Sequence, residues 1–106
     1  MKFRGGMAEL MRQASRMQRK IEKRREELKE ENFEAESGND MVKVTVDGGG
    51  DLVRVEIKDG AIEEEGMEMV MDLVVAASNK ALADAREHVD AELEKVTGGL
   101  KIPGIG

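Results

Sequence analysis

The sequence contains no cysteine, tryptophan or tyrosine, and its only aromatic residues are Phe3 and Phe33. Without cysteine the chain can form neither a disulfide nor a thiolate centre, which fits a reducing compartment. With so few aromatic rings it also lacks the stacking surfaces on which single-stranded nucleic acids are commonly held. The longest wholly apolar run, residues 73–77, is far too short to cross a membrane, and the N-terminus has no apolar signal stretch. These absences predict a cytoplasmic protein.

The chain has 106 residues, enough for one domain, and a net charge of −6 that is unevenly distributed. Residues 1–29 hold ten Lys or Arg against four Glu, a net charge of +6. Residues 30–106 hold seven Lys or Arg against nineteen Asp or Glu, a net charge of −12. Because the local field decides where a polyanion can dock, the acidic average does not exclude nucleic acid as a partner.

Residues 7–31 contain no glycine or proline and are rich in strong helix formers, which predicts a helix of about 37 Å. Its apolar residues recur at heptad spacing, with Arg24 in the one gap: Met7, Leu10, Ala14, Met17, Ile21 and Leu28. We call this row the seam, and it requires a partner. On the opposite side of the helix lies a row of cations, which we call the basic stripe: Arg12, Arg16, Arg19 and Lys23.

The basic stripe has two interpretations. It can be a solvated helix face, in which Glu22, Glu26 and Glu27 pair with neighbouring cations. It can also bind phosphates, which is favoured by the excess of Arg over Lys and by the absence of acidic residues on that face between Arg12 and Lys23.

Three segments alternate apolar and polar residues, as strands with one buried face do: residues 33–37, 41–47 and 52–58. Gly38-Asn39 has the composition of a two-residue hairpin turn, and residues 48–51 connect the last two segments. The pattern predicts a three-stranded antiparallel meander.

The register of this meander follows from keeping the apolar side chains on one face, because a slip of one residue would invert a strand. We therefore expect Val53, Val55 and Ile57 to point inward, and Lys43 to lie opposite Glu56. The predicted apolar pairs are Val46 with Val53, Val44 with Val55, Val42 with Ile57, Phe33 with Val44, and Ala35 with Val42.

A second long helix is predicted from about Glu64 to Val96, after a turn at Asp59-Gly60. Its start is rich in Glu, which the helix dipole favours there, and Gly98-Gly99 ends it. Its apolar face consists of Met67, Val70, Val74, Ala77, Ala81, Ala85, Val89, Leu93 and Val96, widened by Met71, Val75 and Leu82.

The predicted order α-β-β-β-α belongs to the α+β class. We expect one domain over residues 1–106, with a flexible lead-in at residues 1–6 and a tail at residues 98–106. Two long helices and a small sheet cannot bury both apolar helix faces within so short a chain, and the sheet has an open edge. A homodimer would solve both problems, and two-fold symmetry is the commonest arrangement.

No pattern in the sequence indicates catalysis, a metal or a cofactor. Gly48-Gly49-Gly50 leads into a strand and lacks the Lys-Ser or Lys-Thr of a phosphate loop, so a hairpin turn is favoured. His88 is the only histidine and cannot build a zinc site alone. Without an acid–base or nucleophile constellation, we expect a protein that is not an enzyme.

Several segments occur together in one order: Gly5-Gly6-Met7 with LMRQASRMQRKI, then Gly38 with MVKVTVDGGGDLVRVEIKDG, then DLVVAASNKALADA, and finally GGLKIPG. In this combination the sequence resembles the YbaB/EbfC family of bacterial nucleoid-associated proteins over nearly its whole length. The resemblance implies a tweezer-like homodimer with protruding helices that binds duplex DNA. It also implies no catalysis and no cofactor.

We therefore expect a protein of the bacterial nucleoid that binds duplex DNA with low sequence specificity, because phosphate contacts do not read bases. The residues expected to contact DNA are Arg12, Arg16, Arg19 and Lys23, flanked by Lys20, Arg24 and Arg25. Arg24 occupies a seam position, so its alternative role is a contact between the two subunits of the dimer. The alternative function is a protein-interaction adaptor for DNA repair or recombination machinery, in which the seam and the apolar tail hold a partner.

Overall fold

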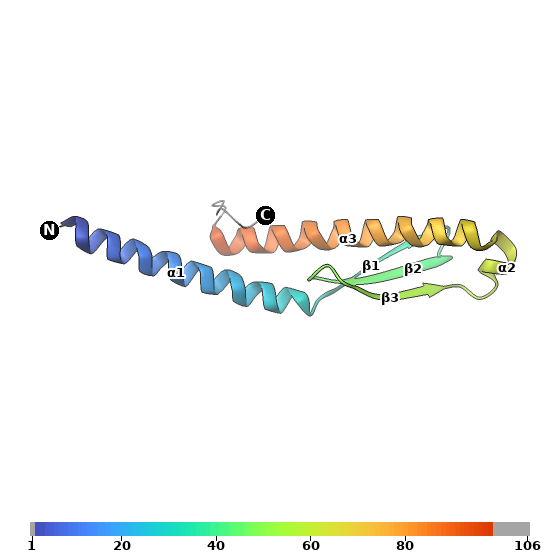
Figure 1. The fold of residues 1–106 in the computed structure, drawn as a ribbon, viewed down its shortest axis with the longest axis horizontal. Helices are drawn as coiled ribbons and strands as arrows, with labels where there is room; N and C mark the ends of the chain where they lie inside the picture. Colours follow the sequence, from blue (N-terminus) through green and yellow to red (C-terminus); the bar gives the residue numbers. More distant parts are fainter. Residues whose placement is uncertain (1, 99–106) are drawn as a thin grey trace.

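The structure, a computed structural model, describes the backbone of residues 2–98 and the side chains of residues 6–98. The elements are α1 (Lys2–Lys29), β1 (Asn32–Ser37), β2 (Val42–Asp47), β3 (Leu52–Ile57), α2 (Ala61–Glu65) and α3 (Met67–Thr97). The predicted α+β class and the order α-β-β-β-α are confirmed, with one short additional helix. The molecule is a rod with extents of 76 × 18 × 16 Å, in which α1 and the sheet follow one another while α3 runs beside both (Figure 1). Apart from Gly98, the expected tail lies outside the described residues.

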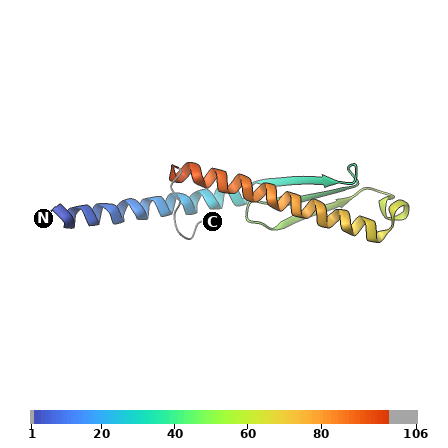
Figure 2. The ribbon, with the colours of Figure 1, turned by 90° about the horizontal axis from the view of Figure 1, so that it is seen from above.

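Helix α3 lies along one face of the sheet, over β1 and β2, and forms the main core with them (Figures 1 and 2). The three strands are antiparallel and follow the order β1-β2-β3. Alanines at every fourth position of α3 let the helix lie close against the valines of β2. The buried residues of this core are Ala35, Val42, Val44, Val46, Ala61, Val70, Ala77, Ala81 and Ala85.

The first hairpin is antiparallel as expected, but its predicted register is wrong by two residues. Phe33 pairs with Val46 and Ala35 pairs with Val44. The connection is longer than the predicted two-residue turn, because residues 38–40 all have positive φ and the last strand pair joins residues 37 and 42. A shift of two keeps the same face buried and gives each valine of β2 a partner on β1, whereas the predicted register left Val46 beyond the end of β1.

Three predicted pairs of the second hairpin are confirmed: Val42–Ile57, Lys43–Glu56 and Val44–Val55. The predicted pair of Val46 with Val53 is wrong, because Val46 pairs with Leu52. The register shifts between Thr45 and Val46, as in a β-bulge, where one strand contains an extra residue.

The second long helix begins later than predicted. Helix α2 occupies residues 61–65, and α3 begins at Met67 rather than at Glu64. Gly66 separates the two helices with φ 88° and ψ 151°, a conformation outside the helical region that favours glycine. The predicted end is confirmed, because Gly98 adopts the left-handed conformation and its N–H points at the carbonyls of Glu94 and Lys95.

Helix α1 begins at Lys2, so the start predicted at Met7 is too late. The helix passes through Gly5-Gly6, because a glycine lowers helix stability by only about 1 kcal/mol relative to alanine and does not forbid the conformation. The helix ends at Lys29, close to the end predicted near residues 31–32.

Helix α1 packs antiparallel against the C-terminal end of α3, but only through its second half (Figure 1). A second core joins the helices: Ile21 and Leu28 with Val89 and Leu93, bordered by Met17 and Val96. Every residue from Gly6 to Arg16 is exposed, including the seam residues Met7 at 65% and Leu10 at 62%. We call residues 6–16 the free arm and residues 17–29 the anchored part of α1.

The face of β3 that was expected to point inward is not covered. Val55 is 38% exposed, whereas its partner Val44 is fully buried, because α3 lies over β1 and β2. Leu73 of α3 packs against Gly38 at the end of β1, so the opposite flank of α3 is turned toward β3. Exposed residues of this region form what we call the open apolar face: Leu52, Val53, Val55, Ile57, Met67, Met71 and Val75.

Candidate nucleic-acid interface

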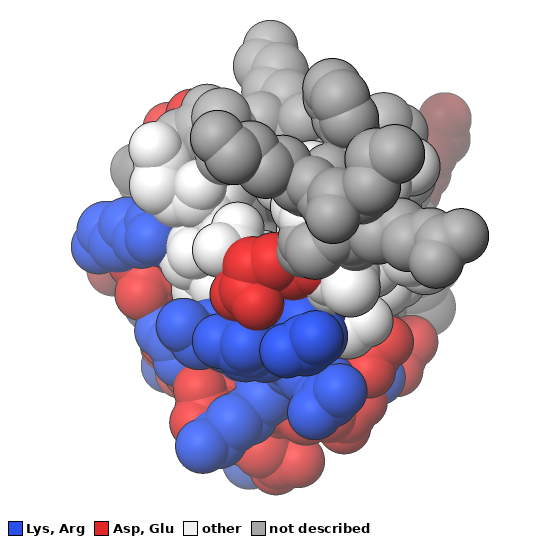
Figure 3. Space-filling view, turned by 90° about the vertical axis from the view of Figure 1, so that its left-hand side faces the viewer, with Lys and Arg blue, Asp and Glu red and all other residues white. Residues whose placement is uncertain are grey.

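The basic stripe runs from the free arm into the anchored part, on the side of α1 opposite the seam. Arg12 and Arg16 lie on the free arm, and Arg19 and Lys23 continue the row; all four are exposed. Figure 3, which views the end of the molecule where α1 begins, shows Lys and Arg side chains gathered along one side, with acidic side chains among them. The stripe is therefore not folded against the acidic body of the protein.

One carboxylate, that of Glu9, contacts both arginines of the first half of the stripe. Glu9 lies 3.6 Å from a guanidinium nitrogen of Arg12 and 3.9 Å from one of Arg16. All three side chains are about half exposed or more, and ion pairs of this kind contribute little stability. A phosphate group can therefore compete with Glu9 for both arginines. Glu9 was not among the predicted site residues, although its spacing of three residues from Arg12 is a contact spacing on a helix.

The other cations of this helix have fewer acidic partners. Within residues 6–98, Arg19, Lys20, Lys23 and Arg25 form no ion pair. A hollow of about 430 Å³ on this side of α1 is lined by Met11, Arg12, Ser15, Arg16 and Arg19. Three guanidinium groups and a hydroxyl thus border one open, shallow hollow, and all of them can donate hydrogen bonds to phosphate oxygens.

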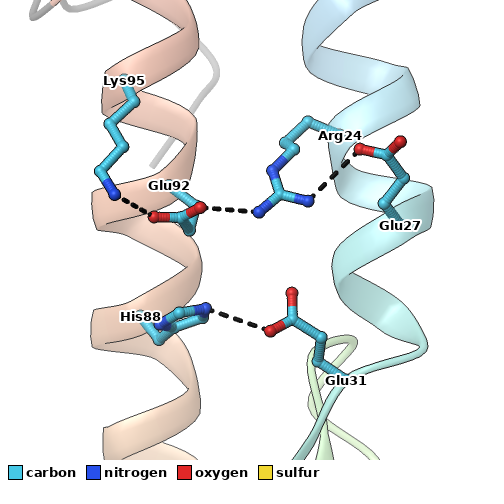
Figure 4. A network of polar contacts seen from close by, with 6 residues as sticks. All are labelled: Arg24, Glu27, Glu31, His88, Glu92 and Lys95. Carbon is cyan, nitrogen blue, oxygen red and sulfur yellow. Dashed lines mark hydrogen bonds and ion pairs between the residues drawn. The ribbon is translucent and has the colours of Figure 1, made fainter.

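Arg24 is placed differently from the other predicted contact residues. Its guanidinium donates a hydrogen bond of 2.6 Å to Glu92 of α3 and one of 3.3 Å to Glu27 of α1 (Figure 4). Glu92 also accepts a hydrogen bond of 2.6 Å from Lys95. The seam position of Arg24 thus leads to a contact within the chain, between α1 and α3.

The surroundings of Glu92 favour its charged form. The Glu92 side chain is only 17% exposed and receives hydrogen bonds from two cations. Lys95 first, and then Arg24, lower the pKa of Glu92 to about 2. In turn, the hydrogen bond to Glu92 raises the pKa of Arg24. Both groups therefore remain ionised at neutral pH.

A second polar contact joins the helices on the same flank (Figure 4). His88 Nε2 lies 3.3 Å from Glu31, just beyond the end of α1. The His88 ring also packs against Phe33, with ring centroids 5.2 Å apart. The contacts of Glu92 with Arg24 and of His88 with Glu31 were not predicted, since nothing local in the sequence indicates that these turns lie together.

The glycine-rich turn is a structural connection, as predicted. The Asp47 carboxylate accepts hydrogen bonds from the N–H groups of Gly49 and Asp51, which closes the turn between β2 and β3. The N–H of Gly48 donates to the carbonyl of Glu31 at 3.0 Å. A Cβ atom at Gly48 would overlap the carbonyl oxygen of Leu28, so this glycine lets the turn press against the end of α1.

Among residues 6–98, no group of three or more His, Asp or Glu side chains is arranged to hold a metal ion. None of the helices in the described part of the chain has the length and apolar character needed to span a membrane.

Comparisons with known proteins identify a family for this chain. The YbaB/EbfC DNA-binding family matches residues 3–100. The chain is 41% identical over 105 residues to the nucleoid-associated protein Teth39_2199 of Thermoanaerobacter pseudethanolicus, covering 97% of this chain and 95% of that one. It is 43% identical over 104 residues to a nucleoid-associated protein of Acetivibrio thermocellus, with 97% and 92% covered.

A solved structure shares the fold. The uncharacterized protein HP0035 from Helicobacter pylori superposes with a TM-score of 0.73 and 24% identity, over 84% of this chain and 94% of that chain. Since the family match spans nearly the whole sequence, the chain belongs to the YbaB/EbfC DNA-binding family.

Proposed function

We propose that this chain is a nucleoid-associated protein that binds duplex DNA with low sequence specificity, as a homodimer, through the basic stripe of α1. The proposal rests chiefly on the exposure of the stripe along a helix that projects beyond the rest of the fold. Membership of a DNA-binding family and relatives named nucleoid-associated proteins support it. The corresponding location is the nucleoid, within the cytoplasm.

The dimensions of the stripe suit contacts with a phosphate backbone. Arg12 and Lys23 are eleven residues apart, which corresponds to about 16 Å along a helix. That length is close to the rise of about five base pairs of duplex DNA. Guanidinium and ammonium groups bind phosphates without reading base edges, so low sequence specificity follows. Lys20 flanks the row, whereas Arg24 is paired with Glu92 and Arg25 lies half-buried toward the seam side of the helix.

The homodimer is supported by the open apolar face. Exposed valines, leucine and isoleucine of β3 lie beside an exposed methionine and valine flank of α3, and no described part of this chain covers them. An open strand edge and an exposed apolar face promote aggregation, and a second copy of the chain would cover them. Two-fold symmetry would then present two basic stripes to one duplex.

The test is a titration of a mixed-sequence duplex with wild-type protein and with the triple variant Arg12→Glu, Arg16→Glu, Arg19→Glu, at two salt concentrations. We expect weaker binding and a flatter log–log salt dependence, by about 0.9 for each phosphate that the variant no longer neutralises. The matched control is Lys58→Glu, Lys80→Glu, Arg86→Glu, which changes the net charge equally at exposed positions outside α1. Equal affinities for the two triple variants would exclude the stripe as the binding surface.

The exposed seam of the free arm favours a second candidate, an adaptor for DNA repair or recombination proteins. Met7 and Leu10 lie on the seam without a partner among residues 6–98 and could pack against another protein. Affinity capture with and without nuclease distinguishes the two functions: a partner retained after complete DNA digestion supports the adaptor, whereas loss of all partners supports DNA binding.

A further inference from the structure

The free arm is fixed in direction by a small contact. No residue from Gly6 to Arg16 is buried, so the arm has no support of its own in the described chain. Its direction is set by the anchored part, where Ile21 and Leu28 of α1 pack against Val89 and Leu93 of α3. Half of the basic stripe, Arg12 and Arg16, therefore lies on a segment whose position depends on packing farther along the helix.

Apolar packing alone leaves the angle between two helices weakly determined. Aliphatic side chains are tolerant of small rotations and slides, whereas hydrogen bonds between charged groups require defined distances and directions. One short hydrogen bond of this kind crosses from the anchored part to α3 in the described chain: the Arg24 guanidinium and the Glu92 carboxylate are 2.6 Å apart and only 29% and 17% exposed. Lys95 binds the other oxygen of Glu92 and holds that carboxylate in place.

We propose that Glu92 is a positioning residue for DNA binding: by holding Arg24 across the α1–α3 contact, it fixes the direction in which the free arm presents the basic stripe. The inference rests on the proposed function, and it assigns Arg24 to the helix contact rather than to a phosphate. The longer contact between His88 and Glu31, at 3.3 Å, lies nearer the end of α1 and supports the same orientation.

The decisive comparison uses two double variants of identical composition and charge. Arg24→Glu with Glu92→Arg exchanges the partners and retains a cross-helix pair. Arg24→Glu with Glu94→Arg places the new cation two residues away, at an exposed position of α3. If Arg24 contacted DNA directly, moving its charge to α3 would impair both variants alike.

Arm position is measured by spin-label distances, since the chain contains no cysteine and labels can be placed freely. Ala8→Cys on the free arm and Ala83→Cys on α3 are both exposed, and labelled chains are diluted with unlabelled protein so that only intrachain distances are seen. We expect the narrowest distribution for the wild type, a somewhat broader one for the exchanged pair, because Lys95 and Glu27 then lie beside like charges, and the broadest for the Glu94→Arg control. Glu92→Gln, a milder change, should also broaden the distribution.

Duplex affinity supplies the second measurement. If loss of the pair leaves the arm in the binding orientation for about a tenth of the time, the control binds about tenfold more weakly than the exchanged pair. Coinciding distance distributions, or coinciding affinities, for the two double variants would overturn the proposal. If wild-type protein bound no duplex at all, the proposed function would fail, while the distances would still show whether the pair holds the arm.

Discussion

The two halves of α1 carry the same seam but have different surroundings. In the anchored part, Ile21 and Leu28 are buried against α3, and Leu28 has no exposed surface. In the free arm, Met7 and Leu10 belong to the same heptad seam and are about two-thirds exposed. Periodicity thus specifies which side of a helix is apolar, but the length of the neighbouring helix determines how much of that side is covered within the chain.

The two halves therefore differ in what they contribute to the body of the protein. The anchored part packs against α3 in the second core, whereas no residue of the free arm is buried in the described chain. Substitutions in the two halves are therefore expected to have unequal effects on unfolding, even where the residue types are the same.

The largest effect is expected for leucine truncation. Leu28→Ala removes a fully buried side chain and should lower the free energy of unfolding by about 2–5 kcal/mol. Leu10→Ala, at a 62% exposed seam position, should change it by less than about 0.5 kcal/mol. Urea denaturation at one fixed chain concentration measures both, and equal losses would show that the free arm is covered in solution.

A smaller loss is expected at the contact between the β2–β3 turn and the anchored part. Gly48→Ala forces a methyl group into the backbone of Leu28 and should lower unfolding free energy by about 2 kcal/mol. Gly49→Ala is the control, because its nearest neighbours are side-chain atoms of Asp47 and Lys29, which can move aside. A Gly48→Ala protein as stable as the control would contradict the close approach of turn and helix.

The ion pair between Arg24 and Glu92 makes a pH-dependent contribution to the free energy of unfolding. Because the pKa of Glu92 is lowered to about 2, from an ordinary value of about 4.5, its contribution is complete above about pH 5 and is lost as the pH falls toward 2. Glu92→Gln should therefore be less stable than wild type at pH 7, with the difference vanishing near pH 2. The control variant Glu94→Gln should have nearly the same stability as wild type at either pH. Urea denaturation curves of all three proteins between pH 2 and pH 7 test this, and a Glu92→Gln protein as stable as wild type at pH 7 would contradict it.

The smallest effect is expected in the free arm. Gly6→Ala adds a methyl group that meets no neighbour and should raise local helix stability by about 1 kcal/mol. Amide hydrogen exchange should slow near residue 6, while the global unfolding transition stays where it is. A shift of the global transition by a comparable amount would mean that the arm unfolds together with the core.

Much of the fold could be predicted because its signals are local. Alternation of valines placed β2 correctly, and Gly98 marked the end of α3. The predicted register of the first hairpin is wrong because a two-residue turn at Gly38-Asn39 is too short: Asp40 also adopts positive φ and belongs to the connection. Gly66 could have indicated the break between α2 and α3, since it interrupts an otherwise continuous helical segment.

The candidate site was predictable only in part. Helical spacing alone placed Arg12, Arg16, Arg19 and Lys23 on one exposed side. The contact of Arg24 with Glu92 could not be predicted, because Glu92 lies 68 residues away and is brought near by the antiparallel packing of α1 and α3. The exposure of Val55 was likewise hidden, since alternation shows which face of a strand is apolar but not whether a helix reaches across it.

The tip of α1 lies far from Ile21, the buried residue nearest to it, so a small change of angle at Ile21 moves the tip by a large distance. From Ile21 to Gly6 the helix extends about 22 Å, so a tilt of about 10° at the anchor displaces the tip by about 4 Å. That displacement exceeds the rise of about one base pair. Sequence changes around Leu28, Gly48 or Glu92 can therefore shift the position of the tip and of its arginines, while the arginines themselves stay unchanged.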